Sequence, residues 1–256
     1  MNRQTLLNLA ILVTVGFITI AGFRTIVSFQ SSFEFEPGPI EGLRTIAGGK
    51  VSAGFSPLVG ISANSDARLG EVPENLCYAL YRKKFWTSDL GVPVASFSDY
   101  NCPYCRIQTM ELAELSANSS TQFVITWHEL ALLGEMSELA ARAALAADRQ
   151  GAYVAFQKKL MTSALLPTPA YLQEIASSIG IDGKRLLSDM QNPQILAMLQ
   201  STKDLSKHLR FIGTPGLVIG RTVILGYMPI DRIEELIEME AGLGIPEYCQ
   251  AQNPLR

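Results

Sequence analysis

Residues 92–106 read VPVASFSDYNCPYCR, and the fold is decided in this stretch. Its first part, VPVASFS, is a short apolar run that predicts a buried strand. The residues that follow the second cysteine, RIQTMELAEL, repeat apolar positions at helical spacing and place Leu112 and Leu115 on a shared side. The motif CPYC, from Cys102 to Cys105, therefore lies where a strand ends and a helix begins.

The two cysteines of this motif point to thiol–disulfide exchange. At the start of a helix, unpaired backbone N–H groups and the helix dipole favour negative charge, so we expect a lowered pKa for the Cys102 thiol. Pro103 suits the first helical turn because its missing N–H has no partner there, and Pro103 and Tyr104 are the residues that tune the pair. The Cys102 thiolate attacks a disulfide, and Cys105, one turn deeper, resolves the mixed disulfide.

Two other roles for the CPYC pair stay open: a structural disulfide, and half of a zinc or copper site. A disulfide that only staples the chain is unusual between a strand and a helix. A zinc site usually needs four ligands, and the sequence holds no second CxxC and no HxxxH. We therefore expect neither a metal nor another cofactor, and of the two histidines we interpret His128 as structural.

A second signal comes from Gly213, Thr214 and Pro215, which precede the apolar run GLVIG. A cis peptide bond before Pro215 would set a tight turn that faces the CPYC helix. The backbone of Thr214 would then bind an extended substrate chain. An ordinary trans-proline loop is the alternative.

The order of elements predicts an α/β fold. A second strand is expected in TQFVITW, several helices within residues 131–209, a hairpin in GTPGLVIG and RTVILGY, and a final helix in IDRIEELIEMEAGLG. Ser137 is the expected N-cap of the first inserted helix, and Arg221 and Thr222 lie near the hairpin turn. Strand, helix, strand, helices, hairpin and helix make a thioredoxin fold with an all-helical insertion.

The N-terminal residues set the expected compartment. Residues 5–23 contain no charge and are long enough to cross a bilayer, with Arg3 before them and Arg24 after them. We expect residues 1–24 to be an uncleaved signal anchor of the bacterial inner membrane, a single pass that leaves the catalytic domain in the periplasm. A cleaved signal and a soluble periplasmic protein are the alternative.

The remaining boundaries follow from composition. Residues 25–88 are rich in glycine, proline and serine and are expected to be an extension or linker, preceding the thioredoxin domain at 89–245 and a tail at 246–256. Cys77 and Cys249 flank that domain, and a disulfide between them would join the extension to the tail. Two free thiols or intermolecular pairing are the alternatives.

Composition excludes several classes of protein. The chain has 256 residues, is 48% hydrophobic and 18% charged, and carries a formal net charge of −3. It can bury a core, so it is not a disordered chain. The acidic balance argues against a nucleic-acid partner.

The blocks FSDYNCPYCR, HELALLGEMSELAARAALAADRQGAYVAFQKKLM and GTPGLVIG resemble the DsbA-like family of extracytoplasmic thiol–disulfide oxidoreductases, over about residues 90–240. The resemblance is closest to the Com1, BdbD and ScsC branch. It implies that Cys102 attacks, that Cys105 resolves, and that Pro215 is the cis-proline, with Thr214 before it. Relatives often carry a buried acidic residue in the strand before the motif, where this chain has Ser96.

The resemblance implies an enzyme that exchanges disulfides with exported cysteine-containing proteins and with a membrane redox partner. Whether it acts as an oxidase, an isomerase or a reductase stays open, because all three share this chemistry. The alternative function is a copper-handling or oxidase-assembly factor that uses the CPYC pair.

Overall fold

The structure is a computed structural model that describes residues 33–53 and 72–250. The expected anchor at 1–24 lies outside the described residues. Within the two described ranges, no helix is both long and apolar enough to cross a membrane.

The chain divides into two compact units, residues 1–35 and residues 36–256. In the first unit the description begins at residue 33, and the rings of Phe33 and Phe35 lie 6.1 Å apart. The second unit contains the sheet, the helices and the CPYC motif.

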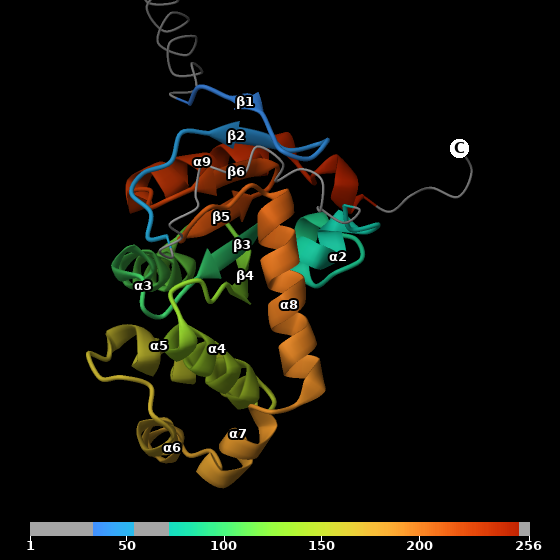
Figure 1. Cartoon of the computed structure of the whole chain (residues 1–256). Helices are drawn as coiled ribbons and strands as arrows, with labels where there is room; N and C mark the ends of the chain where they lie inside the picture. The colour runs from blue at the N-terminus through green and yellow to red at the C-terminus, as the bar shows by residue number, and fades with distance from the viewer. Residues whose placement is uncertain (1–32, 54–71, 251–256) are drawn as a thin grey trace, which may run out of the picture. The chain divides into compact units, whose positions relative to one another are not determined.

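A six-stranded sheet with the order β1-β2-β6-β5-β3-β4 forms the centre of the second unit (Figure 1). The strands are β1 (Glu36–Pro37), β2 (Arg44–Ile46), β3 (Val92–Ser98), β4 (Phe123–Glu129), β5 (Gly216–Ile219) and β6 (Thr222–Leu225). The α-helices are α2 (Leu76–Tyr81), α3 (Pro103–Asn118), α4 (Glu135–Asp148), α5 (Tyr153–Thr162), α6 (Pro169–Ser178), α7 (Gly183–Asp189), α8 (Pro193–His208) and α9 (Ile230–Leu243). Two short 3-10 helices, η2 (Ser88–Leu90) and η3 (Glu247–Cys249), complete the description.

The predicted thioredoxin-like core is confirmed. β3 pairs in parallel with β4, which follows it through α3, and antiparallel with β5. β5 and β6 form the predicted hairpin, and its turn lies at Gly220 and Arg221. Every residue of β3 is buried, as expected for a central strand covered on both faces.

Helices cover both faces of this sheet. α3 and α9 contact each other and the central strands, whereas α2 and α8 pack against the strands from the other face. Since side chains alternate along a strand, Ala95 and Phe97 of β3 belong to the face of α2 and α8, together with Leu80 and Leu205. The end of β3 is therefore held from both sides, and it leads directly into the CPYC motif.

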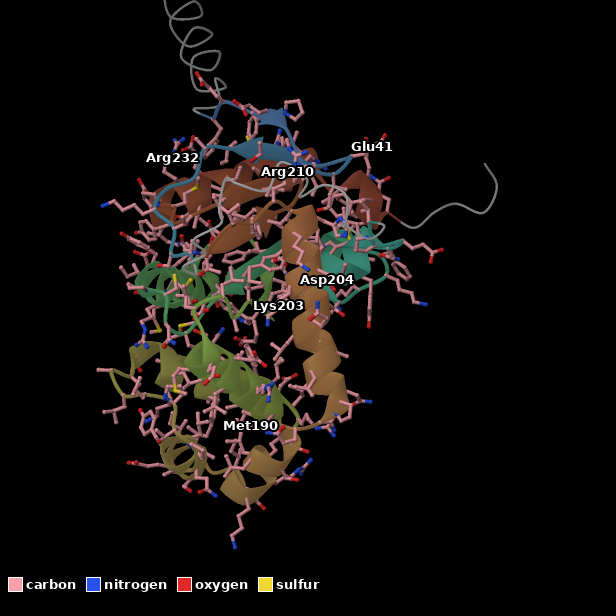
Figure 2. The ribbon with its side chains drawn as sticks, in the orientation of Figure 1. Glu41, Met190, Lys203, Asp204, Arg210 and Arg232 are labelled. Atoms are coloured by element: carbon pink, nitrogen blue, oxygen red, sulfur yellow. A yellow bond between two sulfur atoms is a disulfide. The ribbon has the colours of Figure 1, made fainter. Side chains whose placement is uncertain are left out.

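The predicted helical insertion is confirmed as α4 to α8. α4 presents a run of fully buried alanines, whose small side chains let neighbouring helices approach closely. An ion pair also joins two helices of the insertion, because the amine of Lys203 on α8 lies 3.9 Å from a carboxylate oxygen of Glu138 on α4. Figure 2 shows Lys203 on α8, the helix that runs from the insertion back to the sheet.

The predicted N-cap of the first inserted helix is wrong. α4 begins at Glu135 after Gly134, whose φ of 100° suits glycine. Ser137 lies inside the first turn, and its hydroxyl donates to Asp99 over 2.6 Å. Ser137 therefore connects α4 to the residues before the CPYC motif instead of capping the helix.

The segment expected as an extension or linker is part of the second unit from residue 36 onward. β2 extends the sheet by pairing in parallel with β6, β1 pairs with β2, and α2 packs on the sheet. Strands of two and three residues leave almost no periodic pattern in a sequence. The predicted start of the domain at residue 89 therefore leaves out β1 and β2.

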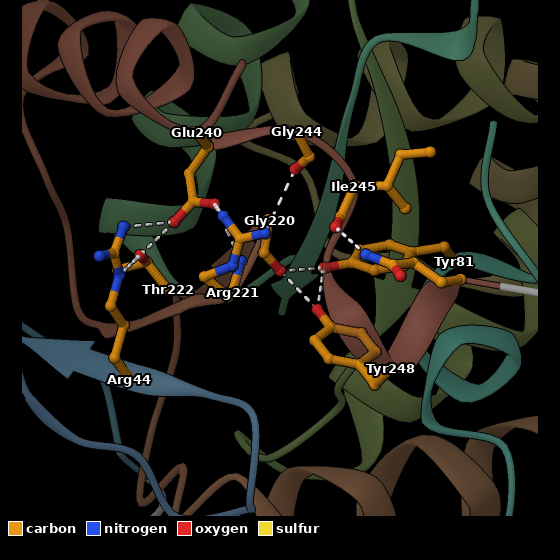
Figure 3. Close-up of polar contacts among 10 residues, drawn as sticks. Arg44, Tyr81, Gly220, Arg221, Thr222, Glu240, Gly244, Ile245 and Tyr248 are labelled. Carbon is orange, nitrogen blue, oxygen red and sulfur yellow. Dashed lines mark hydrogen bonds and ion pairs between the residues drawn. The ribbon is translucent and has the colours of Figure 1, made fainter. Parts of the chain in front are cut away.

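A buried carboxylate fixes this added edge of the sheet (Figure 3). Glu240 of α9 is 1% exposed and lies 2.7 Å from a guanidinium nitrogen of Arg44 on β2. The hydroxyl of Thr222 donates to this same carboxylate oxygen over 2.8 Å, and the other oxygen lies 2.9 Å from a guanidinium nitrogen of Arg221. Two guanidinium groups and a hydroxyl thus compensate the desolvated charge, which ties β2 to α9.

A disulfide between Cys77 and Cys249 joins α2 to η3. The two Cα atoms lie 4.9 Å apart across a sequence separation of 172 residues, and both cysteines are 0% exposed. The backbone N–H of Trp86 also donates to the Cys249 carbonyl over 2.8 Å. The bond therefore connects the segment before β3 to the segment after α9.

Removing this disulfide should destabilise the fold. In a Cys102→Ala/Cys105→Ala background, adding Cys77→Ala and Cys249→Ala should lower the free energy of unfolding by about 3–5 kcal/mol, since the bond closes a long loop. Denaturant unfolding of the two proteins measures the difference. Equal stabilities would mean that packing of α2 and η3 holds the segment without the bond.

Candidate active site

The CPYC motif lies at the N-terminus of α3, and Cys102 is its N-cap residue. The backbone N–H of Cys105 donates to the Cys102 sulfur over 3.0 Å. Hydrogen bonding from the Cys105 side chain is the largest cause that lowers the pKa of Cys102, to about 6, and the side chain of Ser52 adds to it. Burial opposes this shift but does not outweigh it.

The pKa of the second cysteine, Cys105, shifts in the opposite direction. Cys105 is 0% exposed, and burial is the main cause that raises the pKa of its thiol far above the usual range. The neighbouring Cys102 raises it further. In the reduced pair, Cys102 therefore carries the negative charge and Cys105 keeps its proton.

The loop before β5 faces these thiols. The peptide bond between Thr214 and Pro215 is cis. The Cys102 sulfur lies 3.4 Å from the Thr214 carbonyl oxygen, to which it donates when it is protonated. Because β5 pairs with β3, the start of β5 and the residues that follow β3 meet at one edge of the sheet. The structure thus brings together Cys102, Cys105, Thr214 and Pro215, while Pro103 and Tyr104 form the first turn of α3.

One residue of the site comes from the segment that the sequence places in a linker. Ser52 forms an isolated antiparallel bridge with Thr214, and hydrogen bonding from its side chain is one of the causes that lower the pKa of Cys102. No motif marks Ser52, because its position follows from the pairing of β2 with β6. Sequence reasoning misses it for that reason.

The side chains of Asp99 and Arg106, which flank the motif, bind groups of other segments. Asp99 accepts hydrogen bonds from the backbone N–H groups of Leu132 and Leu133, at 2.7 and 2.9 Å, and from Ser137. Arg106 donates through Nε to the carbonyl of Tyr100 over 2.9 Å and also reaches the carbonyls at the end of α5. Both side chains connect the motif to the helical insertion.

A buried carboxyl group lies on the next strand. Glu129 at the end of β4 accepts hydrogen bonds from the hydroxyls of Tyr100, at 2.8 Å, and Tyr153, at 2.6 Å. Burial is the main cause that raises the pKa of Glu129 to about 8. Ser96 is also buried in β3. The buried carboxyl groups near the motif are those of Asp99, which follows β3, and Glu129, at the end of β4. No motif in the sequence marks Glu129.

His128 belongs to the core. Its Nε2 lies 2.7 Å from the carbonyl oxygen of Leu80, and its ring stacks on Phe97 with centroids 4.4 Å apart. Burial is the main cause that lowers its pKa to about 3, so the imidazole is neutral at physiological pH. Among residues 33–53 and 72–250, no group of three or more His, Cys, Asp or Glu side chains is arranged to hold a metal.

The comparison with protein families agrees with this geometry. Residues 93–238 match the family model described as a DsbA-like thioredoxin domain. No curated protein sequence matches the chain.

Solved structures with the same fold include oxidoreductases. The chain is 31% identical to a thioredoxin-like oxidoreductase from Silicibacter pomeroyi DSS-3, over 63% of this chain and 95% of that one, with a TM-score of 0.58. It is 25% identical to the catalytic domain of Proteus mirabilis ScsC, over 64% and 94%, with a TM-score of 0.56. BdbD from Bacillus subtilis, at 22% identity over 62% and 91% with a TM-score of 0.53, shares the fold.

The charge on Cys102 should be measurable directly. In the reduced protein, the ultraviolet absorbance of a thiolate should appear with a midpoint near pH 6, because hydrogen bonds stabilise the anion. The transition should be absent from Cys102→Ala. A midpoint close to that of a free cysteine would contradict the described hydrogen bonding.

Glu129 should make stability depend on pH. Its folded pKa of about 8 exceeds the usual value of 4.5, so it contributes stability at low pH that is lost as pH rises toward 8. In a Cys102→Ala/Cys105→Ala background, Glu129→Gln keeps an oxygen for both tyrosine hydroxyls and removes this titration. Between about pH 5 and 7, the parent should lose stability relative to Glu129→Gln by about 1.4 kcal/mol per pH unit. Parallel unfolding curves would contradict the raised pKa.

Proposed function

The chain belongs to the DsbA-like thioredoxin-domain family, and from that premise we propose that it exchanges disulfides with exported proteins through Cys102 and Cys105. Membership makes it a protein disulfide oxidoreductase. The observation that carries the proposed mechanism is the hydrogen bonding of the Cys102 sulfur, which receives the Cys105 N–H and lies beside the carbonyl of Thr214.

The proposed reaction proceeds in two exchanges. In the oxidising direction, a client thiolate attacks the disulfide at the Cys102 sulfur, and Cys105 leaves as a thiolate that takes up a proton. A second client thiolate then attacks the mixed disulfide, so the client gains a disulfide and Cys102 leaves as a stabilised thiolate. In the reducing direction the Cys102 thiolate attacks first and the Cys105 thiol, after losing its proton, resolves the intermediate.

The pKa of Cys102 favours the oxidising direction. A pKa of about 6 instead of 9.0 stabilises the reduced pair at pH 7 by about tenfold, and this raises the reduction potential by ~30 mV relative to an unperturbed thiol. We therefore infer that the protein donates disulfides to its clients and that a membrane redox partner reoxidises the CPYC pair.

The location is part of the proposal. The uncharged run at residues 5–23 and the buried Cys77–Cys249 disulfide both suit a catalytic domain in the periplasm, anchored by one pass in the inner membrane. The family and the structural neighbours do not favour the alternative role in copper handling.

A trapping experiment tests the chemistry. Cys105→Ala should accumulate a mixed disulfide between Cys102 and exported clients, because the resolving thiol is gone, and non-reducing electrophoresis should show it. Cys102→Ala, the matched control, should trap nothing.

Two further measurements test the rate of disulfide exchange and the direction of the reaction. Both variants should lose disulfide exchange with a reduced, unfolded client by several orders of magnitude. Full activity of Cys102→Ala would exclude the proposed mechanism, and a CPYC pair that is mainly reduced in cells would reverse the proposed direction.

A further inference from the structure

The active site already holds a peptide segment from the same chain. We call residues 50–53 the strap. The backbone N–H of Ser52 donates to the Thr214 carbonyl over 2.8 Å, and the N–H of Thr214 donates to the Ser52 carbonyl over 2.9 Å. A third bond runs from the N–H of Tyr227 to the Lys50 carbonyl over 2.9 Å. The strap is therefore paired antiparallel with the residue before the cis-proline.

These are the backbone groups that an extended client would need. A peptide that binds as an added strand pairs its own N–H and C=O with one residue of the receptor. Both groups of Thr214 that are available for such pairing are bonded to Ser52. A client peptide and the strap cannot occupy Thr214 at the same time.

The side chain of Ser52 lies at the reacting sulfur. Ser52 pairs with Thr214, whose carbonyl oxygen lies 3.4 Å from the Cys102 sulfur, and hydrogen bonding from the Ser52 side chain is one of the causes that lower the pKa of Cys102. Both Cys102 and Thr214 are 0% exposed. Serine carries a hydroxyl on the same carbon atom that carries the thiol in cysteine, but it offers no sulfur for exchange. Ser52 therefore holds the place of a client cysteine without reacting.

The strap is held by close backbone contacts. A Cβ on Gly49 would lie 2.1 Å from the Tyr227 carbonyl oxygen, and a Cβ on Gly213 would lie 2.7 Å from the Ser52 carbonyl oxygen. Neither approach is possible for a residue with a side chain. Before the strap, β2 pairs with β6, so the sheet itself directs this segment to the site (Figure 1).

We propose that the strap is an internal stand-in for the client, which occupies the client site on Thr214 with Ser52 in the position of the client cysteine, and which must leave before a client is bound. This inference rests on the proposed function, since it assigns the occupant of the same site. The strap thereby competes with clients, so that only peptides that displace it gain access to Cys102.

A crosslink tests where the strap lies without any client. In Ser52→Cys/Cys105→Ala, oxidised glutathione reacts with Cys102 to give a mixed disulfide and one glutathione thiolate. The sulfur introduced at position 52 then displaces the second glutathione and forms an internal disulfide with Cys102. Peptide mapping should find this bond and no retained glutathione on Cys102.

The matched control is Val51→Cys/Cys105→Ala, because neighbouring residues of an extended chain point to opposite sides. It should keep glutathione on Cys102. An equal yield of internal crosslink in both variants, or none in the first, would overturn the placement of the strap.

A release experiment tests competition in the full chain. Ser52→Pro removes the N–H that donates to Thr214, whereas Ser52→Ala keeps both backbone bonds and loses only the hydroxyl. The probe is a peptide with one cysteine in a mixed disulfide with glutathione, and each rate is divided by the measured thiolate fraction of Cys102. Ser52→Pro should react about tenfold faster than the unaltered protein, and Ser52→Ala should not be accelerated.

Gly49→Ala, which forces the strap away from Tyr227, provides a second release variant and should also react faster. Equal rates for the unaltered protein and both release variants would overturn the inference while leaving the proposed function intact. A failure of all four proteins to react with the peptide would instead count against the proposed function, and the crosslink would still decide the position of the strap.

Discussion

The central place of β3 is the constraint on which the rest of the molecule depends. β3 pairs with β4 on one side and β5 on the other, and each pairing fixes one part of the site. Its C-terminal end sets the N-terminus of α3, and the start of β5 sets the position of Thr214. Two segments more than 100 residues apart in the chain therefore meet within 3.4 Å at the Cys102 sulfur. Cys102 and Thr214 lie next to each other because both segments are positioned by β3.

The two buried glutamates, Glu240 and Glu129, differ in the partners that surround their carboxyl groups. Glu240 is paired with Arg44 and Arg221, so its charge serves to connect the added strands with α9. Within the described part of the chain, Glu129 receives hydrogen bonds only from two tyrosine hydroxyls, which share one of its oxygens, and burial is the main cause that raises its pKa. A buried carboxylate whose charge is balanced by cationic partners connects the elements that carry them. A buried carboxyl group without such partners has a raised pKa and keeps its proton to higher pH.

The core of the fold and the reacting pair could be predicted from sequence because their signals are local. An apolar run, a CxxC at a helix start and a proline before a second apolar run each lie within a few residues. Ser52, Glu129 and the true start of α4 depend on contacts between distant segments. β1 and β2 are too short to leave a period, Glu129 is one carboxyl among many in the sequence, and Ser137 is used by Asp99 instead of by its own helix. Tertiary contacts decide each of these cases.

The disulfide between Cys77 and Cys249 has a consequence for the order of assembly. Four cysteines allow three pairings, and Cys102 and Cys105 emerge from the ribosome next to each other, long before Cys249. The native bond spans 172 residues, so it can close only after the whole domain between its ends has been synthesised. A chain that carries this bond has therefore been synthesised at least as far as residue 249. A chain interrupted before that residue leaves the Cys77 thiol without Cys249, and this thiol can then react with the disulfides of other molecules.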